Sequence, residues 1–169
     1  ATPMNVIALS DLHGNLPDIN DKFDLMLICG DICPVYTHGR SFQKEWLMDD
    51  FVEWVNKTYD TNEREGSMIV LIAGNHDFVF EGMSVVNRLE FERACHGHLK
   101  YLDNEEFTFY YMVNGLVENT YRIFGCPYCK PFGNWAFMRE NLQKYYDFIP
   151  GGLDFLISHD AADINELGL

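Results

Sequence analysis

The sequence predicts an α/β protein of one domain, in which helices surround a mixed central sheet or sandwich. Four short apolar runs, rich in Val, Ile and Leu, have the length of strands that are buried on both faces. Each run ends in a cluster of polar residues, and amphipathic stretches of helical length lie between the runs. With 169 residues, 47% of them hydrophobic, the chain is long enough for one packed core and too apolar for disorder.

The four predicted strands each lead into their own polar cluster. Residues 6–9 lead into Ser10-Asp11-Leu12-His13-Gly14, residues 25–28 into Cys29-Gly30-Asp31, residues 68–72 into Gly74-Asn75-His76-Asp77, and residues 155–157 into Ser158-His159-Asp160. Ligands of open α/β sheets bind outside the carboxyl ends of the strands. The four clusters are far apart in sequence, but we therefore expect them to converge at one edge of the fold.

The segments between these strands predict three helices and one hairpin. Residues 41–57 form an amphipathic helix with Ser41 as its N-cap and an apolar stripe of Leu47, Phe51, Trp54 and Val55. Residues 84–95 and 139–148 predict two further helices, the second ended by Pro150-Gly151-Gly152. Residues 107–113 and 116–124 flank Asn114-Gly115, a pair that predicts a hairpin turn.

The residue types in the polar clusters suit a divalent metal ion. Asp oxygens, His nitrogens and the Asn amide oxygen are ligands that fit Mn, Fe, Zn or Mg. Asp11 and His13 are two residues apart, so in extended chain they project to the same side of the backbone. Gly30 and Gly74, each directly before a ligand candidate, would let the chain turn sharply as it leaves the sheet. The four clusters in this order are a specific signal for a metal centre.

At these residues the chain resembles the calcineurin-like metallophosphoesterase superfamily, whose pattern is Asp-x-His, Gly-Asp, Gly-Asn-His-Asp and a later His after a strand. Residues 125–137 are similar to the Gly-x-Pro…Phe-Gly-x-Trp-Ala-Phe segment of the metallophosphoesterase-domain-containing branch, which is associated with cyclic-nucleotide phosphodiesterase activity. The resemblance implies a calcineurin-like fold of the four-layer αββα type, with mixed β-sheets in a sandwich flanked by helices. That domain would span residues 4–169, and residues 1–3 look like a tag remnant before Met4.

The resemblance also implies a centre for two divalent metal ions. Asp11 and His13 would bind the first ion, Asn75 and His159 would bind the second, and Asp31 would bridge both. Mn²⁺ is the preferred ion, with Fe, Zn or Mg as alternatives.

Two further residues of the clusters receive catalytic roles from the resemblance. His76 would be the acid that protonates the leaving oxygen or steadies the charged phosphorane. Asp77 would orient the His76 ring, unless it only caps the following turn. His38, in the loop after the second cluster, could reach the site, but a surface position is preferred; Asn15 could cap a turn or touch substrate, and the turn is preferred.

One part of the family pattern is absent from this chain. The family's Gly-His-x-His, which gives one ligand to each metal, does not follow His159. His96-Gly97-His98 has a different spacing and lies at the end of a predicted helix, where Gly97 is typical of a helix stop. We expect the natural protein to continue beyond Leu169, so the fold would lack its C-terminal part.

Two classes of function follow. The first is an enzyme that hydrolyses a phosphoester with a metal-bridged hydroxide, with a small nucleotide-type phosphodiester preferred and a phosphomonoester as the alternative, because the same two-metal clamp serves both. The second is a scaffold or binding protein that keeps the fold but has an incomplete metal site. The intact His76 favours the enzyme, and the absent Gly-His-x-His favours the scaffold.

The amino-acid composition limits which classes of partner the protein is expected to bind. The formal net charge of −14 argues against a nucleic-acid polymer, but not against a small phosphoester substrate, because bound metals reverse the local field. No apolar run approaches the roughly 20 residues of a membrane span, so no membrane partner is expected. Five cysteines, an odd number, without a signal peptide predict reduced thiols and a cytoplasmic location. Cys126 and Cys129 are assigned to loop packing rather than to zinc, and the oligomeric state is left open.

Overall fold

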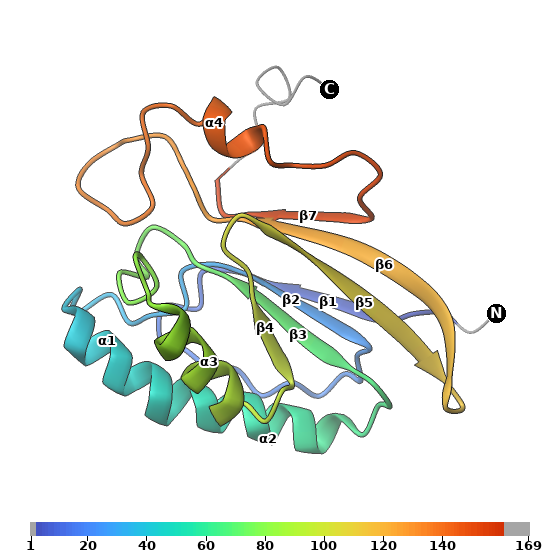
Figure 1. Cartoon of the computed structure of the whole chain (residues 1–169). Coiled ribbons are helices and arrows are strands. Elements are labelled where there is room, and N and C mark those ends of the chain that lie inside the picture. Colours follow the sequence, from blue (N-terminus) through green and yellow to red (C-terminus); the bar gives the residue numbers. More distant parts are fainter. Residues whose placement is uncertain (1–2, 161–169) are drawn as a thin grey trace.

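The computed structural model describes residues 3–160 of the chain. Two β-sheets face each other, and helices cover the outer face of the first sheet (Figure 1). The first sheet has the strand order β1-β2-β3-β4, and the second has the order β5-β6-β7. Residues 1–2 of the predicted tag remnant and residues 161–169 of the predicted domain lie outside the described residues.

The first sheet is parallel throughout and consists of β1 (Val6–Leu9), β2 (Leu25–Cys29), β3 (Met68–Ile72) and β4 (Leu99–Tyr101). The central strands β2 and β3 are buried on both faces, as their continuous apolar runs predict. β1 lies at the end of the strand order, and Val6 is 40% exposed. The prediction that all four runs are buried on both faces is therefore wrong for β1. Ile7 and Leu9 pack against the core under the helices, whereas Val6 and Ala8, which point to the opposite face, are exposed.

The second sheet contains the predicted hairpin, formed by β5 (Glu105–Val113) and β6 (Leu116–Cys126). Its turn residues Asn114 and Gly115 have φ of 51° and 77°, the positive values that a type I′ turn requires. β7 (Phe155–Ser158) pairs in parallel with β6, so this sheet is mixed. β7 alternates rather than being buried on both faces, since Ile157 is buried whereas Leu156 is 37% exposed.

The first predicted helix is longer than expected and has a different N-cap. It consists of three consecutive helical segments, which are α1 (Arg40–Trp46), the π-helical η1 (Leu47–Phe51) and α2 (Val52–Asn62). Gly39 occupies the N-cap position without a side-chain hydrogen bond, and Ser41 lies inside α1. The predicted cap at Ser41 is therefore wrong, because the N-cap lies two residues earlier, at Gly39.

The second predicted helix is confirmed as α3 (Val85–Ala94). The Ser84 hydroxyl accepts a hydrogen bond from the Asn87 backbone N–H, which is the usual N-cap contact. The left-handed position directly after the C-cap Cys95 is taken by His96, with φ of 54°, and the Gly97 N–H donates to the Glu92 carbonyl at 3.3 Å. The prediction of Gly97 as the helix stop is therefore off by one residue.

The third predicted helix is reduced to a single turn, α4 (Gln143–Tyr146). The Arg139 backbone N–H donates to the Cys129 carbonyl at 3.0 Å, and its guanidinium contacts Glu81 at 3.1 Å. These tertiary contacts hold the start of the predicted helix in another conformation. Tyr146 of α4 and Leu156 of β7 line the same surface hollow, which places α4 on the outer face of the second sheet.

Two apolar cores hold these layers together. The first lies between the helices and the first sheet and includes Phe51, Val55, Phe80, Phe91 and Tyr101. The second lies between the two sheets and includes Leu27, Val70, Ile72, Ile123 and Ile157. The second core fixes β7 against the first sheet, and so it also fixes the position of the residues that follow β7.

Candidate metal centre

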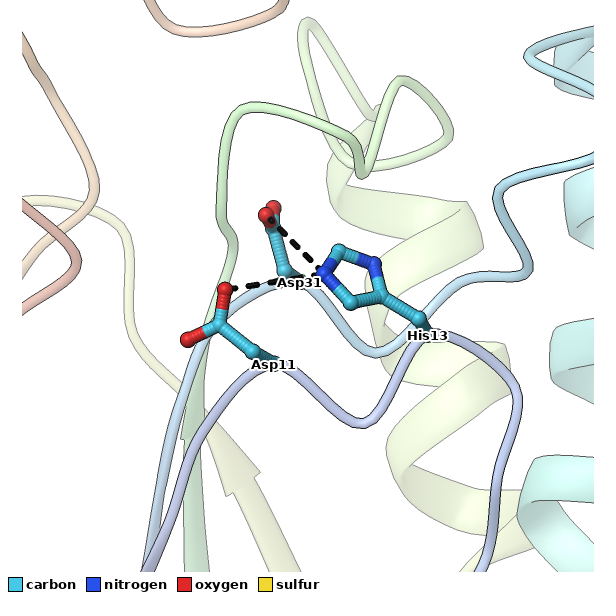
Figure 2. A group of neighbouring side chains, drawn as sticks. All are labelled: Asp11, His13 and Asp31. Atoms are coloured by element: carbon cyan, nitrogen blue, oxygen red, sulfur yellow. Dashed lines mark ion pairs between the residues drawn. The ribbon is translucent and has the colours of Figure 1, made fainter.

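The carboxyl ends of the neighbouring strands β1 and β2 bring three predicted ligands together (Figure 2). The His13 Nε2 atom lies 3.6 Å from the Asp11 Oδ1 atom and 3.9 Å from the Asp31 Oδ2 atom. One ligand atom from each of these residues lies within 4.8 Å of the others. Among residues 3–160, this is the single group of three or more His, Cys, Asp or Glu side chains with that spacing.

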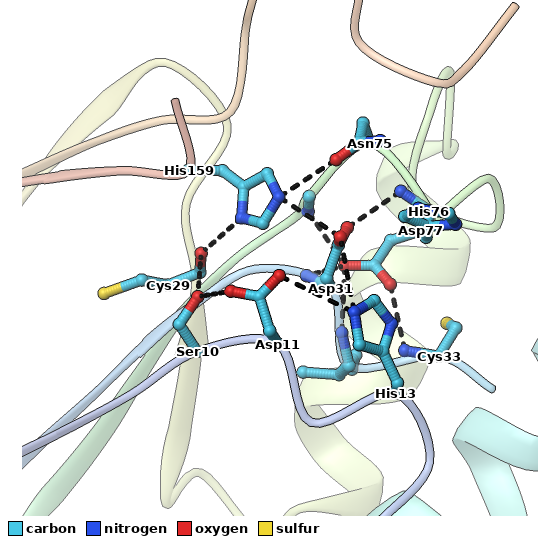
Figure 3. Close-up of polar contacts among 12 residues, drawn as sticks. Ser10, Asp11, His13, Cys29, Asp31, Cys33, Asn75, His76, Asp77 and His159 are labelled. Atoms are coloured by element: carbon cyan, nitrogen blue, oxygen red, sulfur yellow. Dashed lines mark hydrogen bonds and ion pairs between the residues drawn. The ribbon is translucent and has the colours of Figure 1, made fainter. Parts of the chain in front are cut away.

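A second set of predicted ligands meets on the other side of Asp31 (Figure 3). The His159 Nε2 atom lies 3.0 Å from Asn75 Oδ1 and 3.2 Å from Asp31 Oδ2. The His159 Nδ1 atom lies 2.8 Å from the Cys29 carbonyl oxygen, which can only accept, so Nδ1 carries the proton. In the neutral ring, Nε2 therefore has a free lone pair that faces Asp31 and Asn75, as a metal ligand requires.

Asp31 lies between the two sets, and its two carboxylate oxygens have different partners. Its Oδ1 accepts a hydrogen bond from the His76 backbone N–H at 2.8 Å. Its Oδ2 is the atom that approaches both His13 and His159. Burial alone would raise the pKa of Asp31, but the hydrogen bond and charge of His159 and the His76 N–H lower the pKa below its ordinary value. The Asp31 carboxylate is therefore ionised.

The loops that carry these ligands have left-handed backbone conformations. Asp11, His13 and Asp31 have φ of 56°, 47° and 57°. Such values are uncommon for residues other than glycine and gather at functional sites, where the surrounding structure enforces them. The expectation that Asp11 and His13 share one side of an extended chain is therefore wrong. The two residues face one centre because the loop after β1 is bonded to the loop after β2, with Asp11 N–H to Gly30 O at 3.0 Å and His13 N–H to Asp31 O at 2.9 Å.

The two glycines of the predicted turns meet different structural requirements. Gly30 has φ of +93°, so it makes the sharp turn that was predicted. Gly74 has no such φ, and a Cβ there would overlap the backbone nitrogen and carboxylate of Asp31. Gly74 is therefore needed for close approach of the two loops rather than for a turn.

Asp77 is wholly buried beneath the centre and contacts the backbone rather than the His76 ring. Its carboxylate accepts hydrogen bonds from the backbone N–H groups of Gly74 and Asp31, both at 2.8 Å, and of Cys33 at 3.0 Å. The expectation that Asp77 orients the imidazole of His76 does not agree with this geometry. Asp77 instead joins the loop after β2 to the loop after β3.

His76 is held by a residue that the sequence reasoning missed. The buried Gln43 of α1 donates its Nε2 to the His76 carbonyl at 2.8 Å, and its Oε1 accepts from the Val79 N–H at 2.9 Å. The available signal was a polar residue on the apolar stripe, since Gln43 lies four residues before Leu47. Burial lowers the pKa of His76; the charge of Asp31 opposes this, and those of His13, His38 and His159 add to it.

The surroundings of the His76 ring correct a second expectation. His38 was expected on a surface loop away from the site, but its Nε2 lies 3.3 Å from the His76 Nδ1. Trp135, from the segment that suggested the metallophosphoesterase-domain-containing branch, has its ring centroid 4.3 Å from that of His76. The Ala136 N–H donates to the Asn75 carbonyl at 2.9 Å, which ties the Trp135 loop to the loop after β3. The position of His38 in the loop after the second cluster allowed it to reach the site, but no sequence pattern indicated the contact with His76, because it joins two loops 38 residues apart.

The donor set fits a divalent metal. Two carboxylates, two imidazoles and one amide oxygen are the mixed oxygen and nitrogen ligands that Mn, Fe and Zn accept. The Asp11 and Asp31 carboxylates approach one imidazole between them, and a cation there would offset their mutual repulsion. The five cysteines take no part in such a group and are unpaired thiols, and burial raises the pKa of Cys126 and Cys129 to about 11.

Comparison with known proteins identifies the family. Over residues 4–166 the chain matches the family described as calcineurin-like phosphoesterase. No curated protein matched the chain. None of the described helices combines the length and apolar character needed to cross a membrane. The arrangement of two sheets with helices outside agrees with the fold of that family, and its match extends over nearly all of the sequence. The chain therefore belongs to the calcineurin-like phosphoesterase family, whose members are metal-dependent.

Proposed function

We propose that this protein hydrolyses a small phosphodiester and that it holds two divalent cations to do so. The observation that carries the proposal is the position of Asp31 Oδ2, which lies 3.9 Å from His13 Nε2 and 3.2 Å from His159 Nε2. A single carboxylate oxygen between two imidazoles suits a ligand that bridges two cations. Asp11 and His13 would hold the first cation.

The second cation would be held by Asn75 and His159, with Asp31 shared between the two. When bound, the cations would supply an activated water and positive charge for the phosphoryl oxygens. Mn²⁺ is the ion we favour, with Fe, Zn and Mg as the other candidates, because the ligands mix carboxylate, amide and imidazole.

His76 would act as the general acid. Its imidazole faces the first ligand set, with its ring centroid 5.3 Å from that of His13. Burial lowers the pKa of His76, which makes its protonated ring a stronger acid. The Nε2 proton would pass to the leaving oxygen as the bond from phosphorus to that oxygen breaks. General acid catalysis of this kind contributes roughly 10²–10⁴-fold to a rate.

The small size of the proposed substrate rests on charge and on the aromatic residues beside the site. The formal net charge of −14 disfavours a long polyanion and leaves attraction to the cations as the main force on a phosphoester. Trp135 and Phe78 lie next to His76 and His38, where they could contact an aromatic leaving group such as a nucleoside. We further propose a cytoplasmic location, supported by five unpaired thiols.

The test compares two chromogenic substrates in the presence of Mn²⁺. Purified protein is assayed with bis(p-nitrophenyl) phosphate and with p-nitrophenyl phosphate, and its bound metal is measured. Asp31→Ala should abolish turnover, whereas Asp49→Ala, at an exposed position of η1, should not. Faster turnover of the diester supports the proposal, and faster turnover of the monoester makes the protein a phosphatase instead. Bound metal without turnover of either ester would favour a scaffold.

A further inference from the structure

His38 has no role in the scheme above, yet it is the side chain that contacts the His76 ring nitrogen. It lies in the loop between β2 and α1, just before the N-cap Gly39. Its Nε2 is 3.3 Å from the His76 Nδ1, which is within hydrogen-bonding reach for two ring nitrogens. One of these two atoms must carry a proton and the other must accept it.

The two histidines are enclosed by aromatic side chains. The His38 ring centroid lies 5.0 Å from that of Trp135, in a T-shaped contact, and 5.5 Å from that of Phe78. Trp135 also contacts His76 directly. Such packing restricts the rotation of the His38 ring. His38 is half-buried as a result.

We propose that His38 is a positioning residue for His76: it binds the His76 Nδ1 and so directs the His76 Nε2 toward the metal centre. The His76 ring contacts both other histidines, with its centroid 5.3 Å from that of the proposed ligand His13 and 5.4 Å from that of His38. With Nδ1 bonded to His38, the Nε2 atom is left for the substrate. This inference rests on the proposed function, because it assigns His38 to the same reaction.

The proton positions in this pair follow from the donors and acceptors. As the acid, His76 carries protons on both ring nitrogens, so its Nδ1–H donates to the His38 Nε2. His38 is then neutral, with its own proton on Nδ1. In the reaction the attacking water gives its oxygen to phosphorus and a proton to solvent, and the His76 Nε2 proton goes to the leaving oxygen. His76 ends neutral with its proton on Nδ1, so its bond to His38 lasts through the step.

Two other residues near His76 cannot replace His38 in this role. The Asp77 carboxylate is occupied by the backbone N–H groups of Gly74, Asp31 and Cys33. Gln43 binds the His76 carbonyl oxygen rather than its ring. Gln43 therefore holds the main chain of His76, and His38 holds its side chain.

The kinetic test uses variants that separate the hydrogen bond from the packing. His38→Gln places an amide oxygen near the position of Nε2 and should keep most of the activity, whereas His38→Asn is one bond shorter and His38→Phe keeps a ring but cannot accept. The last two should lower kcat by roughly 10–100-fold, a loss of the size that follows removal of a residue that orients a metal-binding histidine, with metal content unchanged. The matched control is His98→Phe, which retains a ring against Tyr59. Neither His98 nor Tyr59 belongs to the proposed metal centre.

Two features of these rates would not follow from a merely structural role. The loss in His38→Phe should be larger for a diester with a phenol leaving group than for one with p-nitrophenol, which needs less help from an acid. In a His76→Ala background, His38→Phe should cause no further loss. Equal losses on both esters, or full additivity of the two substitutions, would overturn the proposal.

A spectroscopic measurement tests the contact without any turnover. In metal-free protein with ¹⁵N-labelled histidine rings, neutral His76 should exist as the single Nδ1–H tautomer. His38→Phe and His38→Asn should convert it to a mixture, and His38→Gln should not. An unchanged His76 tautomer in His38→Phe would overturn the assignment. Absent turnover in the unsubstituted protein would refute the proposed function alone, since the ring spectra decide the role of His38 separately.

Discussion

Asp31 is the residue on which the most contacts of the centre depend. Its Oδ1 holds the backbone of His76, and its Oδ2 approaches His13 and His159. Asp11, by contrast, is exposed and approaches His13 alone among the proposed ligands. The two carboxylates are of the same chemical type, but their surroundings give them different roles.

The two aspartates should therefore respond differently to substitution. We predict that Asp31→Ala binds neither cation, because both would lose a ligand and the His76 loop would lose its hydrogen bond. Asp11→Ala should lower the affinity for one cation and keep the other. Elemental analysis after dialysis against Mn²⁺ measures the difference. Equal metal content in the two variants would contradict a bridging role for Asp31.

The pKa of His159 predicts how the stability of the metal-free protein depends on pH. Burial would lower its pKa, but the hydrogen bond and charge of Asp31 outweigh burial and raise the pKa to about 9, above the ordinary 6.5. Because the pKa is higher in the folded state, the protonated ring stabilises the fold fully below pH 6.5, and that stabilisation disappears as the pH rises toward 9. The loss should be on the order of 2–3 kcal/mol, measured by urea unfolding at a series of pH values. His159→Gln should remove this part of the pH dependence, and an identical profile in the variant would rule it out.

At the scale of elements, the loops after β2 and β3 act as one unit. Asp77 bonds to backbone N–H groups of both loops, and Gly74 lets Asp31 lie directly against the loop after β3. The two strands are neighbours in one sheet, so their carboxyl ends start side by side. This pairing of loops sets the distance between Asp31 and Asn75.

Gly74→Ala should separate these loops. The added Cβ would overlap Asp31, and overpacking of a well-packed site costs roughly 1–3 kcal/mol. We expect a lower midpoint of thermal unfolding together with a loss of bound Mn²⁺. Gly151→Ala is the control, because a Cβ at Gly151 meets no atom within 4 Å. Metal binding at the original level in Gly74→Ala would show that the close approach is not required.

At the scale of the whole molecule, the centre is assembled from both sheets. The first sheet carries four of the proposed ligands, and β7 of the second sheet carries His159 (Figure 3). The core between the sheets therefore sets the distance from His159 to the other ligands. Ile157, two residues before His159, is buried in that core.

Shortening Ile157 should disturb the ligands of the second cation in particular. Ile157→Ala should cost about 2–5 kcal/mol of stability, as is usual for a buried aliphatic residue. Because β7 would pack less tightly against the first sheet, the position of His159 would be less well fixed. The affinity for the second cation should therefore fall more than the affinity for the first. Leu156→Ala is the control, since Leu156 lies on the same strand with its side chain on the outer face. Calorimetric titration with Mn²⁺ would show two unequal sites, and equal weakening of both would contradict a second-sheet origin of one site.

The strands and the chemistry of the centre could be predicted from sequence because both depend on local order. β2 and β3 are continuous apolar runs, and the hairpin turn at Asn114 and Gly115 needs two adjacent residues that tolerate positive φ. Because ligands of open α/β sheets bind outside the carboxyl ends of the strands, Asp31 and Asn75 are placed at one edge of the sheet for any conformation of the loops. The third helix was overpredicted, because Arg139 binds Glu81, 58 residues earlier, and the local helical preference gives way.

The sequence by itself determined which side chains stand at the ends of the strands, and so the kind of chemistry that this protein can carry. Only the tertiary structure decided how those side chains are held: Asp77 on the backbone, Gln43 on the His76 carbonyl and His38 on the His76 ring. The physical reason is that a strand is specified by the pattern of its own residues, whereas a hydrogen bond between two loops depends on the path of both. Those paths are set by packing between distant segments, which a single stretch of sequence does not contain.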